Sequence, residues 1–160
     1  MVTYKTRAIS LKASPFAEAD KLVTLFTYDH GKIRAVAKSA RKIPSRLAGR
    51  VEPFTYADYF IAKGRSLDII SQCQVIETFH KVRQDPLALM AGLYIVKLVT
   101  SGTSEGQPYP DLFDLLLKGL ELLRAGEEPR QTARNFELAF AKLEGIYRDD
   151  VSPHYGLSEH

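Results

Sequence analysis

The chain has 160 residues, with 22 Lys or Arg against 19 Asp or Glu, and 45% of its residues are hydrophobic. This composition is ordinary for a globular protein and argues against long disordered segments. The longest apolar run, residues 87–96, is too short for a membrane-spanning helix, which needs about 20 residues, and the N-terminal residues lack the apolar core of a signal peptide, so we expect a cytoplasmic protein.

The first half of the chain predicts five β-strands. The clearest is residues 32–38, where apolar Ile33, Ala35 and Ala37 alternate with basic side chains, as in a strand with one face buried. The turn residues 29–31 separate it from the strand before it. The five predicted strands are residues 3–13, 20–28, 32–38, 54–62 and 67–78.

A short helix is predicted between the third and fourth strands, within residues 43–53. Pro44 suits the first turn of a helix, and Pro53 would end it. Three strands, a short helix and two strands follow the order of an OB-fold barrel, a fold that commonly binds oligonucleotides. We therefore expect an α+β protein with a five-stranded OB-fold domain over residues 1–80.

The second half predicts an all-α helical domain over residues 85–160, with the boundary at residues 80–84. Asp85-Pro86 is an N-cap followed by proline at the first helical position. Helices are expected over residues 87–99, over residues 111–124 and from Pro129 onward. The first of these is apolar nearly all round, so it needs cover on every side. It is expected to bury Leu89, Leu93 and Val96. Either an apolar groove remains open beside it, or the helices pack closed.

Catalytic and metal motifs are absent from the sequence, so we expect no enzyme and no cofactor. Phosphate-binding and dinucleotide-binding glycine patterns do not occur. Cys73 is the single cysteine, which excludes an internal disulfide and a cysteine-based zinc site, and the histidines show no metal-ligand spacing. The dipeptide Asp29-His30 fits a turn, where both residue types form local hydrogen bonds.

A basic segment at residues 31–50 is the most informative feature. It contains seven Lys or Arg and no acidic residue, while residues 81–160 hold more acidic than basic residues. One interpretation is that these charges form a solvated face that keeps the domain soluble. The favoured one is DNA binding, because clustered cations release counterions from phosphates and aromatics on the next strand (Phe54, Tyr56, Tyr59 and Phe60) offer stacking surfaces. The predicted DNA-binding residues are Lys32, Arg34, Lys38, Arg41, Lys42, Arg46 and Arg50.

Residues 15–54 resemble the RecO family of bacterial recombination mediators. The family pattern begins with Glu-x-Asp and Leu-Val and continues with Thr-x-x-x-Gly-Lys, a Lys-Gly-Ala-Arg-Lys stretch, Ser-Arg and Pro-Phe. It is matched by Glu18, Asp20, Leu22, Val23, Thr27, Gly31, Lys32, Lys38, Ala40, Arg41, Lys42, Ser45, Arg46, Pro53 and Phe54. The resemblance is close over residues 3–84 and looser through the helices, for example at residues 136–138 and 143–146.

The resemblance implies an OB barrel followed by a helical domain, with no catalytic residues. It also implies binding of single- and double-stranded DNA, annealing of complementary strands, and loading of recombinase onto strands coated by single-stranded-DNA-binding protein. The implied protein partners are RecR and the acidic, apolar C-terminal tail of that single-strand binder. The implied location is the cytoplasm, on the nucleoid.

The chain departs from the family pattern in three ways. Ala17 and Ser39 stand where the family often has glycine, so local turns are expected to differ slightly. Family members are typically longer, and many carry a four-cysteine zinc module that this sequence lacks.

Two further functions compete with a DNA-annealing mediator. In an interaction adaptor, the helical half would dock repair partners and the basic segment would only aid solubility. A nuclease is disfavoured because no carboxylate cluster with metal spacing is visible. We expect DNA contacts without base specificity.

Overall fold

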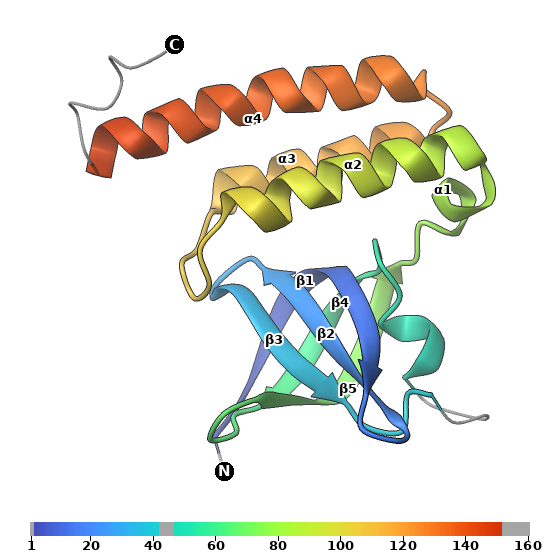
Figure 1. Cartoon of the computed structure of the whole chain (residues 1–160), viewed down its shortest axis with the longest axis vertical. Helices are drawn as coiled ribbons and strands as arrows, with labels where there is room; N and C mark the ends of the chain where they lie inside the picture. The colour runs from blue at the N-terminus through green and yellow to red at the C-terminus, as the bar shows by residue number, and fades with distance from the viewer. Residues whose placement is uncertain (1, 42–46, 152–160) are drawn as a thin grey trace.

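The computed structural model describes residues 2–41 and 47–151, with backbone alone for residue 48 and residues 146–151. The predicted site residues Lys42 and Arg46, and residues 43–46 of the predicted short helix, lie outside the described residues. A five-stranded barrel lies beneath a layer of helices (Figure 1). The elements are β1 (Thr3–Phe16), β2 (Asp20–Thr27), β3 (Gly31–Ala37), the 3-10 helix η1 (Ala48–Arg50), β4 (Tyr56–Ala62), β5 (Asp68–Glu77), α1 (His80–Gln84), α2 (Pro86–Gly102), α3 (Pro110–Arg124) and α4 (Pro129–Val151).

The strands close into a barrel in the order β1-β2-β3-β5-β4. All neighbours are antiparallel except β3 and β5, which pair in parallel. The long strand β1 pairs with both β2 and β4, and its pairing with β2 shifts register between Ser10 and Lys12. Such an irregularity increases local twist, which lets one strand serve two neighbours around a small barrel. The topology confirms the predicted OB-like barrel and the α+β class.

The barrel interior is filled by the inward residues of all five strands. Val23, Leu25, Tyr59 and Ile61 are fully buried there. At one end Leu47 and Val51, which flank η1, complete this cluster. The predicted short helix is therefore a single 3-10 turn within the described residues, and it covers one end of the barrel.

Helix α2 begins where Asp85-Pro86 predicts, and the carboxylate of Asp85 accepts a hydrogen bond from the backbone N–H of Leu87 at 3.1 Å. The five residues His80–Gln84, predicted as a boundary, form the short helix α1 instead. In Figure 1 α2 and α3 lie next to the barrel, and α4 lies above them.

Helix α2 is less enclosed than the sequence predicts. Val96 is buried and Leu89 is half-buried, but Leu93 is 46% exposed, so the prediction for Leu93 is wrong. Four large apolar side chains of α2 are exposed: Leu87, Met90, Leu93 and Tyr94, whose hydroxyl donates to Glu137 of α4 at 2.7 Å. We call these four residues the α2 stripe. An apolar surface is thus open, as one of the two alternatives anticipated, in the form of an exposed stripe along the helix.

A second apolar cluster joins the barrel to the helices. Phe26 and Phe54 of the barrel half are fully buried in one cluster with Ile95 and Phe113 of the helices. Phe54 has a φ of 81°, and its ring lies so close to Gly92 that a Cβ there would be 2.8 Å from it. Only glycine fits at this crossing, so the Phe54 ring packs directly against the backbone of α2 at Gly92.

Candidate nucleic-acid interface

Lys32, the first predicted DNA-binding residue, is bound to the helical half. Its ammonium donates hydrogen bonds to the carbonyls of Thr100 at 2.7 Å and Thr103 at 3.0 Å. These carbonyls lie at the C-terminal end of α2, where the last turn has no intrahelical partners and the helix dipole favours a cation. Lys32 therefore caps α2, and its charge is directed into the protein.

Arg34 also faces the helical half. Its Nε lies 3.2 Å from Oε1 of Glu105 in the loop between α2 and α3. The same loop adds to the edge of β3, because the N–H of Gly106 donates to the carbonyl of Lys32 at 3.0 Å. Together these contacts attach the loop to the start of β3, so Lys32 and Arg34 first serve to hold the two halves together.

Lys38 and Arg41 lie beyond the other end of β3. Both are exposed, and no ion pair to either is found among the described residues. Arg41 reaches across to the turn between β1 and β2, where its guanidinium donates to the carbonyl of Ala17 at 3.1 Å. Because a strand rises about 3.3 Å per residue, Lys38 is roughly 20 Å from Lys32. The predicted basic segment is therefore divided between two ends of the barrel.

Arg50 joins Lys38 and Arg41 at the end covered by η1. Its side chain is exposed, and its guanidinium donates to the carbonyl of Cys73 on β5 at 3.2 Å. We call Lys38, Arg41 and Arg50 the η1-end cations. They are the members of the predicted set that the described structure leaves turned to solvent without an acidic partner.

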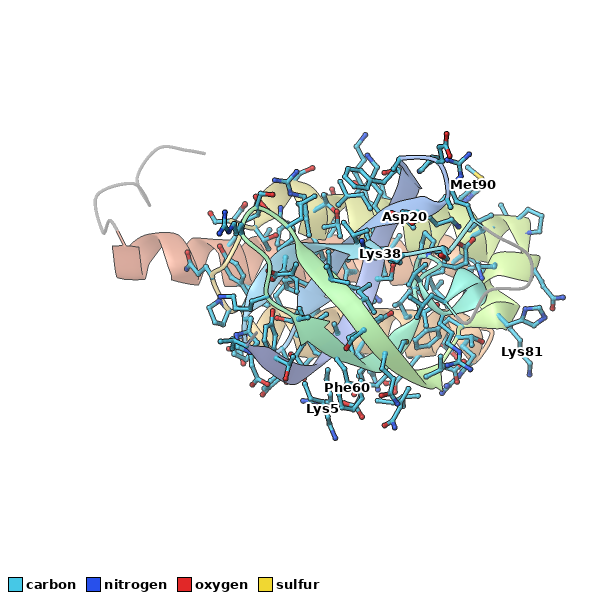
Figure 2. The ribbon with its side chains drawn as sticks, turned by 90° about the horizontal axis from the view of Figure 1, so that it is seen from below. Lys5, Asp20, Lys38, Phe60, Lys81 and Met90 are labelled. Carbon is cyan, nitrogen blue, oxygen red and sulfur yellow. The ribbon has the colours of Figure 1, made fainter. Side chains whose placement is uncertain are left out.

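The aromatic residues of the fourth predicted strand are mostly core. Phe54 and Tyr59 are fully buried and Tyr56 is 9% exposed, so these three are not stacking surfaces. Phe60 is half-buried on the outside of β4. The ammonium of Lys5 on β1 lies 5.8 Å from its ring centre, and Figure 2 shows both side chains together on the outer surface. One aromatic ring of the four is thus available to a ligand.

The interior of the barrel offers no reactive group to solvent. Cys73 is 1% exposed, and burial raises the pKa of its thiol to about 11, so it stays protonated near neutral pH. In the described part of the chain, His, Cys, Asp and Glu side chains do not gather in threes that would suit a metal ion. No helix of that part combines the length and apolarity needed to cross a membrane.

A feature that the sequence did not reveal is a pocket of about 480 Å³ at the barrel end away from η1. We call it the mouth pocket, and its walls include Tyr4, His30, Ile33, Lys63 and Asp68. These residues come from β1, the β2–β3 turn, β3, the loop after β4 and the start of β5. The alternating pattern of Ile33 predicts its inward direction, but no local signal brings Tyr4 and Asp68 together across the barrel.

The chain is similar to known proteins over nearly all its length. Residues 1–79 match the family described as Recombination protein O N terminal, and residues 83–149 match Recombination protein O C terminal. It is 42% identical over 145 residues to the DNA repair protein RecO of Pelotomaculum thermopropionicum, covering 91% of this chain and 56% of that protein. It is 37% identical over 149 residues to the DNA repair protein RecO of Desulforamulus reducens, covering 93% of this chain and 58% of that protein. The chain therefore spans a little over half the length of these relatives.

The two matched regions include the strands of the barrel and the helices that follow them. The resemblance seen in residues 15–54 is thus part of a similarity that continues through α4. The chain belongs to the RecO family.

Proposed function

We propose that this chain acts in DNA repair as a DNA-binding recombination mediator, which anneals single strands and helps to load recombinase. Family membership supports the repair role. The observation that carries DNA binding is the set of η1-end cations, which project from one end of the barrel without acidic partners among the described residues. This role implies a place in the cytoplasm, on the nucleoid.

Cations of this kind suit both single- and double-stranded DNA. Lys and Arg bind phosphate oxygens, which fix the position of a strand but carry no base information. A surface that neutralises two strands at once also reduces their mutual repulsion and so favours annealing. Lys42 and Arg46 belong to the same segment of the chain, and we include them among the proposed contacts. Lys32 and Arg34 are left out because their cationic groups hold the α2–α3 region.

The salt dependence of binding to a fluorescent 20-nucleotide strand tests this proposal. Five phosphate contacts predict a log–log slope near −3.5, from about 0.7 per contact on single strands. Reversing the charge of Lys38 and Arg41 together should weaken binding to every sequence and slow annealing of complementary strands. Reversing Arg130 and Arg134, two exposed cations on α4, is the matched control. Equal loss in both double variants would show that overall charge, not the η1 end, governs binding.

The protein partners proposed for the chain are RecR and the C-terminal tail of single-stranded-DNA-binding protein. The α2 stripe favours the tail, because an apolar and acidic peptide needs an exposed apolar surface with a nearby cation. Leu87 is 52% and Met90 is 67% exposed, and exposed Lys97 follows Tyr94 by one helical turn. We assign RecR no surface, and co-elution of RecR with the chain tests that partnership.

Titration of a labelled tail peptide separates a mediator from a pure interaction adaptor. Leu93→Asp should abolish saturable peptide binding while leaving the affinity for DNA unchanged, because the α2 stripe and the η1 end are separate surfaces. Leu138→Asp on α4, where Leu138 is 54% exposed outside the stripe, is the matched control. If the peptide binds but the parent chain neither binds nor anneals DNA, the adaptor role is the correct one.

A further inference from the structure

The mouth pocket has the size and form of a ligand site. Its volume of about 480 Å³ lies within the usual range for small-ligand pockets, roughly 300–1,000 Å³. A second hollow of about 300 Å³ adjoins it and shares Ile33, Asp68 and Gly106. The 3-10 helix covers the opposite end of the barrel, and the α2–α3 loop reaches this end at Gly106. The partly buried Ile33 packs on the barrel core and forms part of its floor.

Two aromatic rings and a carboxylate occupy fixed positions in this pocket. The ring centres of Tyr4 and His30 are 4.3 Å apart at an interplanar angle of 48°, and His30 is exposed while Tyr4 is half-buried. Burial raises the pKa of the Tyr4 hydroxyl, and the negative charge of nearby Asp68 raises it further. The backbone N–H of Gly64 donates to the same carboxylate at 3.3 Å. A carboxylate offers about four acceptor positions, so Asp68 keeps acceptor capacity for a ligand.

The charges around the mouth pocket favour an uncharged group inside it and phosphates at its rim. Asp29 and Asp68 line the pocket and would repel a phosphate that entered it. Lys63 at the pocket and Arg65 in the same loop are both exposed, so they lie where an anionic backbone would pass. A flat, uncharged group with hydrogen-bond donors fits the interior, and its attached phosphates fit the rim.

We propose that the mouth pocket receives one unpaired nucleobase of a DNA strand, stacked on His30 with Tyr4 behind it, and that Asp68 accepts a hydrogen bond from the base. This inference rests on the DNA binding proposed above. Cytosine presents its N4 amino donor where thymine presents the O4 acceptor, and the single N3–H donor of an unpaired thymine lies between two carbonyl oxygens that repel a carboxylate. The carboxylate therefore favours cytosine over thymine at this one position, while the phosphate contacts elsewhere remain independent of sequence.

The test compares the affinities of the whole chain for 20-nucleotide strands of deoxycytidine and thymidine at neutral pH, by fluorescence anisotropy. His30→Ala should weaken binding of the cytidine strand about fivefold or more, the loss expected when one base loses its aromatic partner. Asp68→Asn should remove the preference for cytidine but retain the bond from Gly64. Tyr4→Phe should keep most of the stacking and reduce the preference. Phe60→Ala, on the outer surface of the barrel, is the matched aromatic control and should bind both strands like the parent chain.

The possible outcomes distinguish this proposal from the one on which it rests. If the parent chain binds both strands but His30→Ala and Asp68→Asn behave like it, the pocket holds no base and DNA binding stands. A larger loss for Phe60→Ala than for His30→Ala would move the stacked base to the outer surface and overturn the assignment. If the parent chain binds neither strand, DNA binding itself is wrong. Circular dichroism of each variant confirms that an affinity change is not a loss of fold.

Discussion

The two ends of strand β3 carry similar basic side chains in different surroundings. At its start, Lys32 and Arg34 meet the carbonyls of α2 and the carboxylate of Glu105. Beyond its other end, Lys38 and Arg41 project into solvent near the turn between β1 and β2. A cation capping a helix contributes to stability, whereas an exposed cation adds little to folding and remains available to phosphate. The role of each residue is therefore set by what the fold brings against it.

Removing the helices is the most drastic change to the surface of the barrel that packs against them. A fragment of residues 1–80 would expose Phe26, Phe54 and Phe79, which are fully buried in the cluster shared with the helices. Each such ring contributes about 1.5–3 kcal/mol when buried. We expect the fragment to aggregate or to lose its near-ultraviolet circular dichroism. A monodisperse fragment with a cooperative unfolding transition would contradict this and would support an independent domain over residues 1–80.

Gly31→Ala should be the most damaging single substitution at the start of β3. Gly31 has a φ of 72°, and a Cβ there would lie 2.2 Å from the backbone carbonyl oxygen of Gln107. Left-handed strain and a clash with backbone should together lower the free energy of unfolding by about 3 kcal/mol. Gly49→Ala at the η1 end is the control, since no atom lies within 4 Å of the position that a Cβ would take there. Denaturant unfolding of both variants measures the contrast, and equal changes would refute it.

Lys32→Met and Lys38→Met compare the two ends directly. Lys32→Met should destabilise the fold by about 1–3 kcal/mol, because two carbonyls at the end of α2 lose a charged donor. Its affinity for DNA should change little. Lys38→Met should leave stability within about 0.5 kcal/mol and make the log–log salt slope for single strands less negative by about 0.7. The opposite pattern would reverse the roles assigned to the two ends.

The η1 end contains two positions with local strain. Ala17 has a φ of 53° and Ser39 a φ of 61°, in the left-handed region that favours glycine. The N–H of Ser39 donates to Asp20 at 2.8 Å, and this bond does not depend on the Ser39 side chain. Ala17→Gly and Ser39→Gly should each raise stability by about 0.5 kcal/mol, since relief of strain outweighs the extra freedom of the unfolded chain. Thermal unfolding checks this, and a lower melting temperature in either variant would contradict it.

Acid should weaken the contact that Glu77, the last residue of β5, makes with Arg124 of α3, although the effect is small. Burial tends to raise the pKa of Glu77, but hydrogen bonds from the Phe79 N–H and from Arg124 leave it below its usual 4.5. A carboxyl with a lowered pKa stabilises the fold above its unfolded pKa, and this contribution disappears as pH falls through the folded pKa. Stability should therefore decline below about pH 4.5, and less steeply in Glu77→Gln. Identical pH profiles for the two chains would rule out this contact as a cause.

The architecture was largely predictable because its signals are local. Alternation at Ile33, Ala35 and Ala37 predicted a strand, and Asp85-Pro86 predicted the start of α2; both elements are present. The single 3-10 turn of η1 and the short helix α1 were not predicted in that form. Each contains five residues or fewer, too few to establish a helical period in the sequence.

The surroundings of individual side chains were less predictable because they depend on distant contacts. Lys32 meets Thr100 and Thr103, about 70 positions later in the chain, and no local pattern reports such a contact. The inward direction of Tyr59 follows from alternation, but the burial of Phe54 depends on Gly92 in α2. Leu93 was predicted to be buried because α2 is apolar nearly all round. In the described structure Leu93 remains 46% exposed, although α4 reaches the neighbouring Tyr94 through Glu137.

The environment of Cys73 has a practical consequence for labelling. A thiol reacts with maleimide dyes as the thiolate, and Cys73 is both 1% exposed and protonated near neutral pH. It is also the single cysteine of the chain. A reporter cysteine placed at exposed Ser66, beside the mouth pocket, would therefore take up the dye selectively without first removing the natural thiol. The native sequence can therefore carry a single dye at a chosen position while Cys73 stays unlabelled.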